Sequence, residues 1–148
     1  MSTYIQIIYH IVFGTKHRMP SLAEEHRPRL FGYIRGILRN KNCHAYRIGG
    51  MEDHLHIATH LHPTVPLASL VKDIKLGCSA FIKETGLFPE FDGWQQGYGA
   101  FTCSYSGKDR LIAYIKNQQK HHRTVSFREE YRALLEKHGI AFEEKYLL

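Results

Sequence analysis

Residues 54–62 read HLHIATHLH, and the four histidines of this stretch all fall on even-numbered positions: His54, His56, His60 and His62. Successive side chains of a β-strand point to opposite faces, so a strand here places the four imidazoles on one face and the aliphatic residues on the other. Two histidines at this spacing can both reach one metal ion. The stretch therefore predicts a strand with a candidate metal site. It leaves open which pair binds, and a polar strand face in contact with water is the simpler interpretation.

Hydrophobic patterning on both sides of this strand predicts the other elements. Strands are expected at 4–13, 43–50, 54–62 and 93–104, and helices at 22–41 and after Pro63 and Pro66. Apolar residues alternate along the strands and recur at helical spacing in the helices. The resulting order, βαββαβ, predicts an α+β fold of the ferredoxin-like type with an antiparallel sheet.

Two helices are expected to follow the last strand. The first covers about 107–122, and the second begins at Ser126 and stops at Gly139. Ser126 and Glu129 have the spacing of a capping box, and glycine commonly ends a helix. The chain shows no internal repeat and no linker, so we expect a single domain over 1–148.

Composition and charge favour an anionic partner. The chain has 148 residues, a net charge of +6 and 43% hydrophobic residues, and its isoelectric point is near 9.3. Nucleic acid is the commonest partner of such a basic chain. Candidate phosphate contacts are Lys16 and Arg18, in a basic loop at 14–21, and Lys72 and Lys75, on the polar side of the second helix.

The cysteines and the N-terminal segment bear on the compartment. Cys43, Cys78 and Cys103 are odd in number and contain no CxxC pair, which argues against a disulfide framework and a cysteine zinc site. We therefore expect a cytoplasmic protein. The first apolar run is interrupted by Gln6 and His10, so it reads as a strand and no membrane association is expected.

Residues 114–122, YIKNQQKHH, form a second candidate region. On a helix Tyr114 and Gln118 share a face, being four residues apart. By themselves they are more simply a packed tyrosine and a surface amide. His121 and His122 extend the same helix end, where positive charge suits the helix dipole, so they need no function. The preceding GYGAFTCS (97–104) is best interpreted as a strand entry with Phe101 in the core.

Several of these segments, taken in order, resemble the small insertion-sequence transposases with one catalytic tyrosine. These enzymes belong to the HUH superfamily, named for His-hydrophobic-His. The matching segments are YHIVFGTKHR near the start, DHLH at 53–56, WQQGYGAFTCS, YIKNQ at 114–118 and NQQKHHRTVSFREEYRALLEKHGI. The resemblance covers nearly the whole chain, and the order, spacing and total length make it specific.

The resemblance implies roles for individual residues. Tyr114 matches the nucleophile, and His54, His56 and Gln118 match the ligands of a Mg²⁺ or Mn²⁺ ion, whereas His60 and His62 are expected outside the metal site. Gln119 makes the register ambiguous, but only Gln118 shares the face of Tyr114. A phenol with a pKa of about 10 is a poor nucleophile, and a metal ion polarises and orients the scissile phosphate.

The family resemblance also implies a reaction and partners. The enzymes cleave and rejoin single-stranded DNA at insertion-sequence ends through a 5′-phosphotyrosine intermediate and release a 3′-OH. They recognise hairpins near these ends and act as homodimers. Gly107 precedes the tyrosine helix and could act as a hinge, so Tyr114 could serve its own sheet or that of a partner.

Three alternatives remain open at this point. The main one is a noncatalytic nucleic-acid-binding module on the same fold. A second is a replication initiator or relaxase, although such proteins are usually longer. A third is a metal hydrolase, which would need a carboxylate near the ion. Only Glu52 and Asp53 are close in sequence to the histidines, and Asp53 is expected on the opposite strand face.

Overall fold

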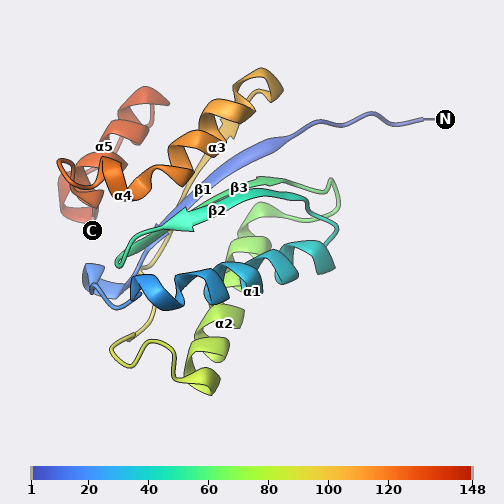
Figure 1. Cartoon of the computed structure of the whole chain (residues 1–148). Coiled ribbons are helices and arrows are strands. Elements are labelled where there is room, and N and C mark those ends of the chain that lie inside the picture. The colour runs from blue at the N-terminus through green and yellow to red at the C-terminus, as the bar shows by residue number, and fades with distance from the viewer. Residues whose placement is uncertain (1, 148) are drawn as a thin grey trace.

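Residues 2–147 are described in the computed structural model (Figure 1). Four antiparallel strands form one sheet in the order β2-β3-β1-β4. The strands are β1 (Ile8–Gly14), β2 (Ala45–Gly50), β3 (His54–His60) and β4 (Gly99–Cys103). The α-helices are α1 (Arg27–Asn40), α2 (Leu67–Thr85), α3 (Lys108–Lys116), α4 (Gln118–His121) and α5 (Phe127–Lys137). The antiparallel sheet and the mixed helices and strands confirm the α+β prediction, and the βαββαβ order is the one expected of a ferredoxin-like plan.

Helices cover both faces of the sheet. In Figure 1, α1 and α2 lie on one face, and α3, α4 and α5 lie on the other. The main core lies under α1 and α2, where Ile11, Phe13, Leu55 and Ile57 of the central strands are fully buried. Burying each such side chain contributes about 1.5–3 kcal/mol. The other face carries a smaller apolar cluster: Val12, Phe101, Phe127, Tyr131, Leu135 and Leu147.

Two glycines let helices lie close to this second face. A Cβ at Gly49 of β2 would lie 2.7 Å from a side-chain carbon of Ile115 in α3. A Cβ at Gly99 of β4 would lie 2.7 Å from the ring of Tyr131 in α5. Real Cβ atoms do not approach other atoms so closely, because repulsion rises steeply below contact distance. The helices that carry the site described below therefore rest directly on the sheet backbone.

The first and fourth strands are shorter than predicted. The first strand begins at Ile8 rather than at residue 4, and Ile5 and Ile7 are 40% and 38% exposed instead of lying on a buried face. Residues 2–7 extend beyond the sheet, where no neighbouring strand continues to pair with them (Figure 1). The fourth strand begins at Gly99, not at residue 93, with only an isolated bridge between Trp94 and Thr15 before it.

The histidine strand and the tyrosine helix also differ from the predictions. The strand ends at His60, so His62 lies beyond it and its ring bonds to Thr64 instead of sharing the histidine face. The predicted helix over about 107–122 is broken at Asn117, which has the non-helical ψ of 19°. The last helix matches its prediction, because the Ser126 hydroxyl accepts a hydrogen bond from the Glu129 amide. Among residues 2–147, none of the helices combines the length and apolarity needed to cross a membrane.

Candidate active site

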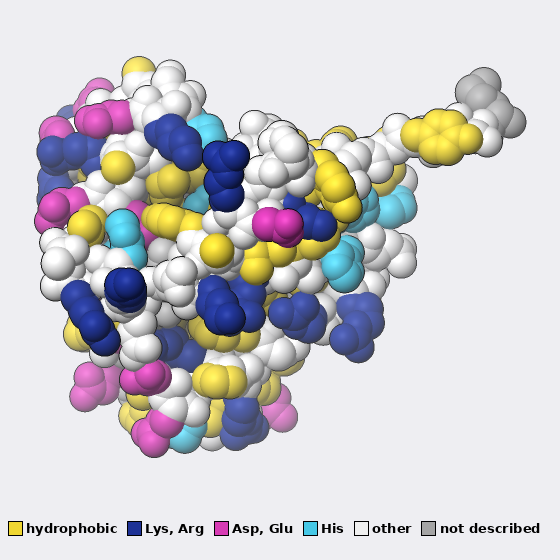
Figure 2. Space-filling view, turned by 45° about the horizontal axis from the view of Figure 1, so that its top comes forward, with side chains coloured by type: hydrophobic (Ala, Val, Ile, Leu, Met, Phe, Trp, Pro, Cys, Tyr) yellow, Lys and Arg dark blue, Asp and Glu magenta, His cyan; other side chains and the backbone are white. Residues whose placement is uncertain are grey.

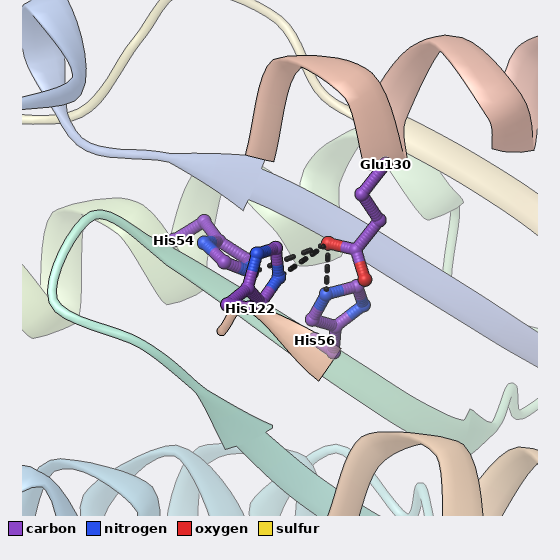
Figure 3. Close-up of side chains that lie close together, drawn as sticks. All are labelled: His54, His56, His122 and Glu130. Atoms are coloured by element: carbon purple, nitrogen blue, oxygen red, sulfur yellow. Dashed lines mark hydrogen bonds and ion pairs between the residues drawn. The ribbon is translucent and has the colours of Figure 1, made fainter. Parts of the chain in front are cut away.

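A cluster of histidines around one carboxylate lies on the face of the sheet covered by α4 and α5. His54 and His56 of β3 meet His122, just after α4, and Glu130 of α5 (Figure 3). One potential ligand atom from each residue lies within 4.8 Å of all the others. Oε1 of Glu130 is 3.1 Å from Nε2 of His56, 3.1 Å from Nε2 of His122 and 3.3 Å from Nε2 of His54.

Glu130 is a buried carboxylate held by several donors. Its residue is only 2% exposed, and an unpaired charge at such depth would be costly. Burial alone would raise the pKa of Glu130, but hydrogen bonds from His122, His54 and His56 outweigh it and hold the pKa far below its usual range. The cluster therefore concentrates a permanent negative charge among imidazoles.

The two strand histidines are held on their outer nitrogens as well. Nδ1 of His54 lies 2.7 Å from Asp53, and Nδ1 of His56 lies 2.7 Å from Nε2 of His10. These contacts turn both Nε2 atoms toward Glu130, in the way that second partners orient metal-binding histidines. The prediction that Asp53 lies on the opposite face is wrong, because Asp53 precedes the strand and reaches back to the ring of His54.

The same contacts give the histidines different proton affinities. Burial would lower the pKa of His54, but the hydrogen bonds to Asp53 and Glu130 outweigh it and raise the pKa to about 9. Burial lowers the pKa of His56, and burial together with the neighbouring His56 lowers the pKa of His10 to about 3. His10 and His56 are therefore neutral near pH 7, a state in which imidazole can bind metal.

Tyr114 of α3 reaches the same carboxylate. Its hydroxyl donates a short hydrogen bond to Oε2 of Glu130, and its ring centre lies 5.7 Å from that of His56. Burial and the adjacent Glu130 charge raise the pKa of the phenol. One oxygen of Glu130 thus faces three imidazoles, while the other faces the phenol and lies 3.4 Å from Nε2 of His121. In this structure Tyr114 meets the histidines of its own chain.

Gln118 completes the cluster, despite the helix break at Asn117. Its side-chain oxygen lies 2.9 Å from Nε2 of His54 and 2.9 Å from Nε2 of His122, and its amide donates to Glu130. Gln119 points elsewhere and donates to Glu24. The structure therefore brings Tyr114, His54, His56 and Gln118 together, and it leaves His62 outside.

Two residues of the cluster were missed in the sequence. His122 was interpreted as having no function, yet its ring bonds to Glu130, Gln118 and the carbonyl of Val125. Glu130 was missed because it is far from the histidines in sequence, whereas the two acidic residues close to them are Glu52 and Asp53. A signal for Glu130 does exist: it lies on the buried stripe of α5 with Phe127 and Tyr131, where an acidic residue is unusual.

The four basic residues proposed to contact DNA differ in their surroundings. Lys16 and Lys72 are exposed, and Arg18 lines a cavity that also contains Asp53 and His122. Lys75, in contrast, donates to the carbonyls of Gln95 and Gly97, which occupies its ammonium group. Figure 2 shows further Lys and Arg side chains in a band across one face of the molecule.

Comparisons with known proteins give a family match and two structures of similar fold. The family described as "Transposase IS200 like" matches residues 3–118. A crystal structure from Deinococcus radiodurans R1, named as a candidate transposase, superposes with a TM-score of 0.62 at 22% identity and covers 80% of this chain and 95% of its own. A REP-associated tyrosine transposase bound to a REP hairpin gives a TM-score of 0.61 at 17% identity, with 84% of this chain and 76% of that chain covered. We found no match among curated protein sequences. Since the family match spans most of the sequence, the chain belongs to the IS200-like transposase family.

Proposed function

We propose that this transposase cleaves and rejoins single-stranded DNA at insertion-sequence ends through a 5′-phosphotyrosine formed on Tyr114. The observation that carries the proposal is the contact between the Tyr114 hydroxyl and Glu130, inside the cluster that contains His54 and His56. A nucleophile, a carboxylate and a set of metal-binding side chains converge at one point, which is the arrangement expected for metal-assisted attack on a phosphodiester.

A divalent ion fits the donors of this cluster. His54, His56 and Gln118 supply two imidazole nitrogens and an amide oxygen, and Glu130 adds a carboxylate oxygen. Mixed nitrogen and oxygen donors with a carboxylate suit Mn²⁺, and Mg²⁺ with retained water ligands. When bound, the ion would polarise the scissile phosphate and neutralise charge that develops during attack.

The chain's own groups account for the proton and bond changes. The Tyr114 oxygen attacks phosphorus, a phenol–phosphorus bond forms, and the bond from phosphorus to the 3′ oxygen breaks. Oε2 of Glu130 already accepts the phenol hydrogen bond, so it holds the hydroxyl in place, and the phenol proton passes to solvent as the new bond forms. The leaving 3′ oxygen takes a proton from solvent and becomes a hydroxyl. That hydroxyl can later attack the phosphotyrosine, which returns the phenol and joins two DNA strands.

Hairpin DNA is the proposed substrate. One structural relative is bound to a REP hairpin, and this chain carries a net charge of +6. Lys16, Arg18 and Lys72 remain candidates for phosphate contacts, whereas the hydrogen bonds of Lys75 to backbone carbonyls make it the weakest of the four. We also propose a cytoplasmic location, which agrees with a DNA substrate.

The test uses single-stranded DNA from the genomic flanks of the gene. With Mn²⁺ we expect a covalent protein–DNA band on a denaturing gel, and none with a chelator. His56→Ala should abolish the band because it removes a central donor of the metal site. His62→Ala is the matched control and should leave the band, since His62 lies outside the cluster.

Two results would count against the proposal. A protein that binds the DNA but never forms the band, with any divalent ion, would favour the noncatalytic binding module. A band that survives His56→Ala and disappears with His62→Ala would place the metal at the other end of the histidine stretch.

The active protein is proposed to be a homodimer, because two element ends must be cut and exchanged together. Since Tyr114 lies beside His56 of its own chain, we expect a site within each chain before strand exchange. Mixing Tyr114→Phe with His56→Ala protein, each inactive alone, tests whether the partner's tyrosine can also be used. Recovered cleavage in verified heterodimers would show shared sites. Persistent inactivity would restrict each site to one chain, and a monomer at micromolar concentration would refute the dimer.

A further inference from the structure

We propose that a cavity beside Tyr114 binds the base of a nucleotide next to the phosphate that this tyrosine attacks. The inference rests on the proposed function and gives it a base-recognition site. The cavity has a volume of about 350 Å³ and lies between β4, α3 and α5. Ligand sites are typically about 300–1,000 Å³, so there is room for a single base and part of its sugar.

The cavity adjoins the reacting group directly. Tyr114 and His10 form part of its wall, and these residues also contact Glu130 and His56 in the cluster described above. A phosphate placed for attack by Tyr114 therefore lies at the cavity's inner end. The base attached to the neighbouring sugar is then within reach of the cavity, because only the sugar separates them.

The walls offer flat apolar surfaces. Phe101 and His138 line the cavity and are stacked, with ring centres 4.6 Å apart and planes at 24°. Phe101 is buried and His138 is exposed, so the imidazole ring supplies the accessible flat surface. Leu111 from α3 and Leu134 from α5 close two other sides. Aromatic and aliphatic walls of this kind bind bases by stacking, which tolerates different bases but requires that a base be present.

The charge around the cavity suits a nucleotide. Arg110 and Lys137 line it, and none of its lining residues is acidic. Neither cation takes part in an ion pair within residues 2–147. Free cations at the edge of an apolar cavity favour a ligand with an apolar ring and a phosphate over a neutral apolar ligand.

Cys103 provides a natural reporter. It lines the cavity and is half-buried, whereas Cys43 and Cys78 are buried in the main core. Alkylation of the native, metal-free protein by iodoacetamide should therefore report chiefly on Cys103. Deoxynucleoside 5′-monophosphates should slow this reaction by covering the thiol, and deoxyribose 5-phosphate serves as the probe that lacks a base.

We expect protection at nucleotide concentrations at least about fivefold lower than with deoxyribose 5-phosphate, because stacking adds affinity. Leu134→Trp should fill the cavity and remove the protection. Leu76→Trp is the control, since Leu76 is 60% exposed and lies on α2, across the sheet. Arg110→Gln, an exposed site on α3, provides a second variant that should weaken protection without filling the cavity.

Two results of the alkylation experiment would overturn the inference: equal protection by deoxyribose 5-phosphate, or no protection by any of the nucleotides. The alkylation rate of Cys103 is measured without any DNA cleavage. Protection without a covalent adduct would therefore refute the proposed function and leave the base site standing. An adduct whose yield is unchanged by an abasic nucleotide on either side of the cleaved phosphate would refute the base site alone.

Discussion

Tyr114→Phe is expected to abolish covalent attachment of DNA while leaving hairpin binding within about twofold of the wild type. The substitution removes only the hydroxyl that donates to Glu130. The ring still packs against His10, His56 and His121, so the helix should keep its position. Loss of a sole nucleophile removes the covalent route altogether, whereas binding depends on phosphate contacts made elsewhere.

Two measurements separate these effects. A denaturing gel reports the adduct, and fluorescence anisotropy with a labelled hairpin reports binding. Binding by both proteins should weaken steeply as salt is added, because phosphate contacts release counterions. If the Tyr114→Phe protein still formed adducts, the nucleophile would be another residue, with the exposed Tyr105 the next to replace.

Glu130→Gln should be nearly as damaging, although the side chain keeps its shape. The carboxylate is the only anion in direct contact with the Nε2 atoms of His54, His56 and His122 within the described chain. An amide keeps one oxygen but loses the negative charge, and its NH2 group cannot accept the hydrogen bond that Oε2 accepts from the phenol. We expect metal affinity to fall by about 10–100-fold, the range for loss of a supporting group, or more if the carboxylate ligates directly.

Titration calorimetry with Mn²⁺ measures the affinity, and the adduct assay measures the chemistry at saturating metal. Glu136→Gln is the matched control, because Glu136 is exposed on the same helix and contributes nothing to the cluster. Reduced adduct formation at saturating metal would support a role of Glu130 in positioning the phenol in addition to metal binding. Unchanged affinity and unchanged adduct yield would remove Glu130 from the site.

The local part of this architecture could be predicted from the sequence. Strand parity placed His54 and His56 on one face, and the helical patterns located α1, α2 and α5. The four-residue separation of Tyr114 and Gln118 anticipated that both would approach the same point. Both residues do reach the same point, but not on one continuous helix. The helix breaks at Asn117, and Gln118 reaches the cluster from a separate turn.

The long-range part could not be predicted in the same way. Glu130 is 74 residues from its partner His56, and no local pattern specifies which buried stripe will meet which strand. The start of β1 was misplaced for a related reason. Alternation around Ile5 and Ile7 satisfies the strand pattern, but a strand also needs a neighbour to pair with, and pairing partners are set by the tertiary fold.

The close contacts at Gly49 and Gly99 have a consequence for how mutations act on this enzyme. The heights of α3 above β2 and of α5 above β4 are set by glycine hydrogen atoms, because a methyl group at either position would lie too close to Ile115 or Tyr131. An alanine at either position would act as a spacer, lifting α3 or α5 from the sheet without changing Tyr114 or any residue of the histidine and Glu130 cluster. A shift of this kind of about 1 Å can cost roughly 100-fold in rate. A genetic screen for inactivating mutations should therefore also recover substitutions of Gly49 and Gly99, which set the distance of these helices from the sheet.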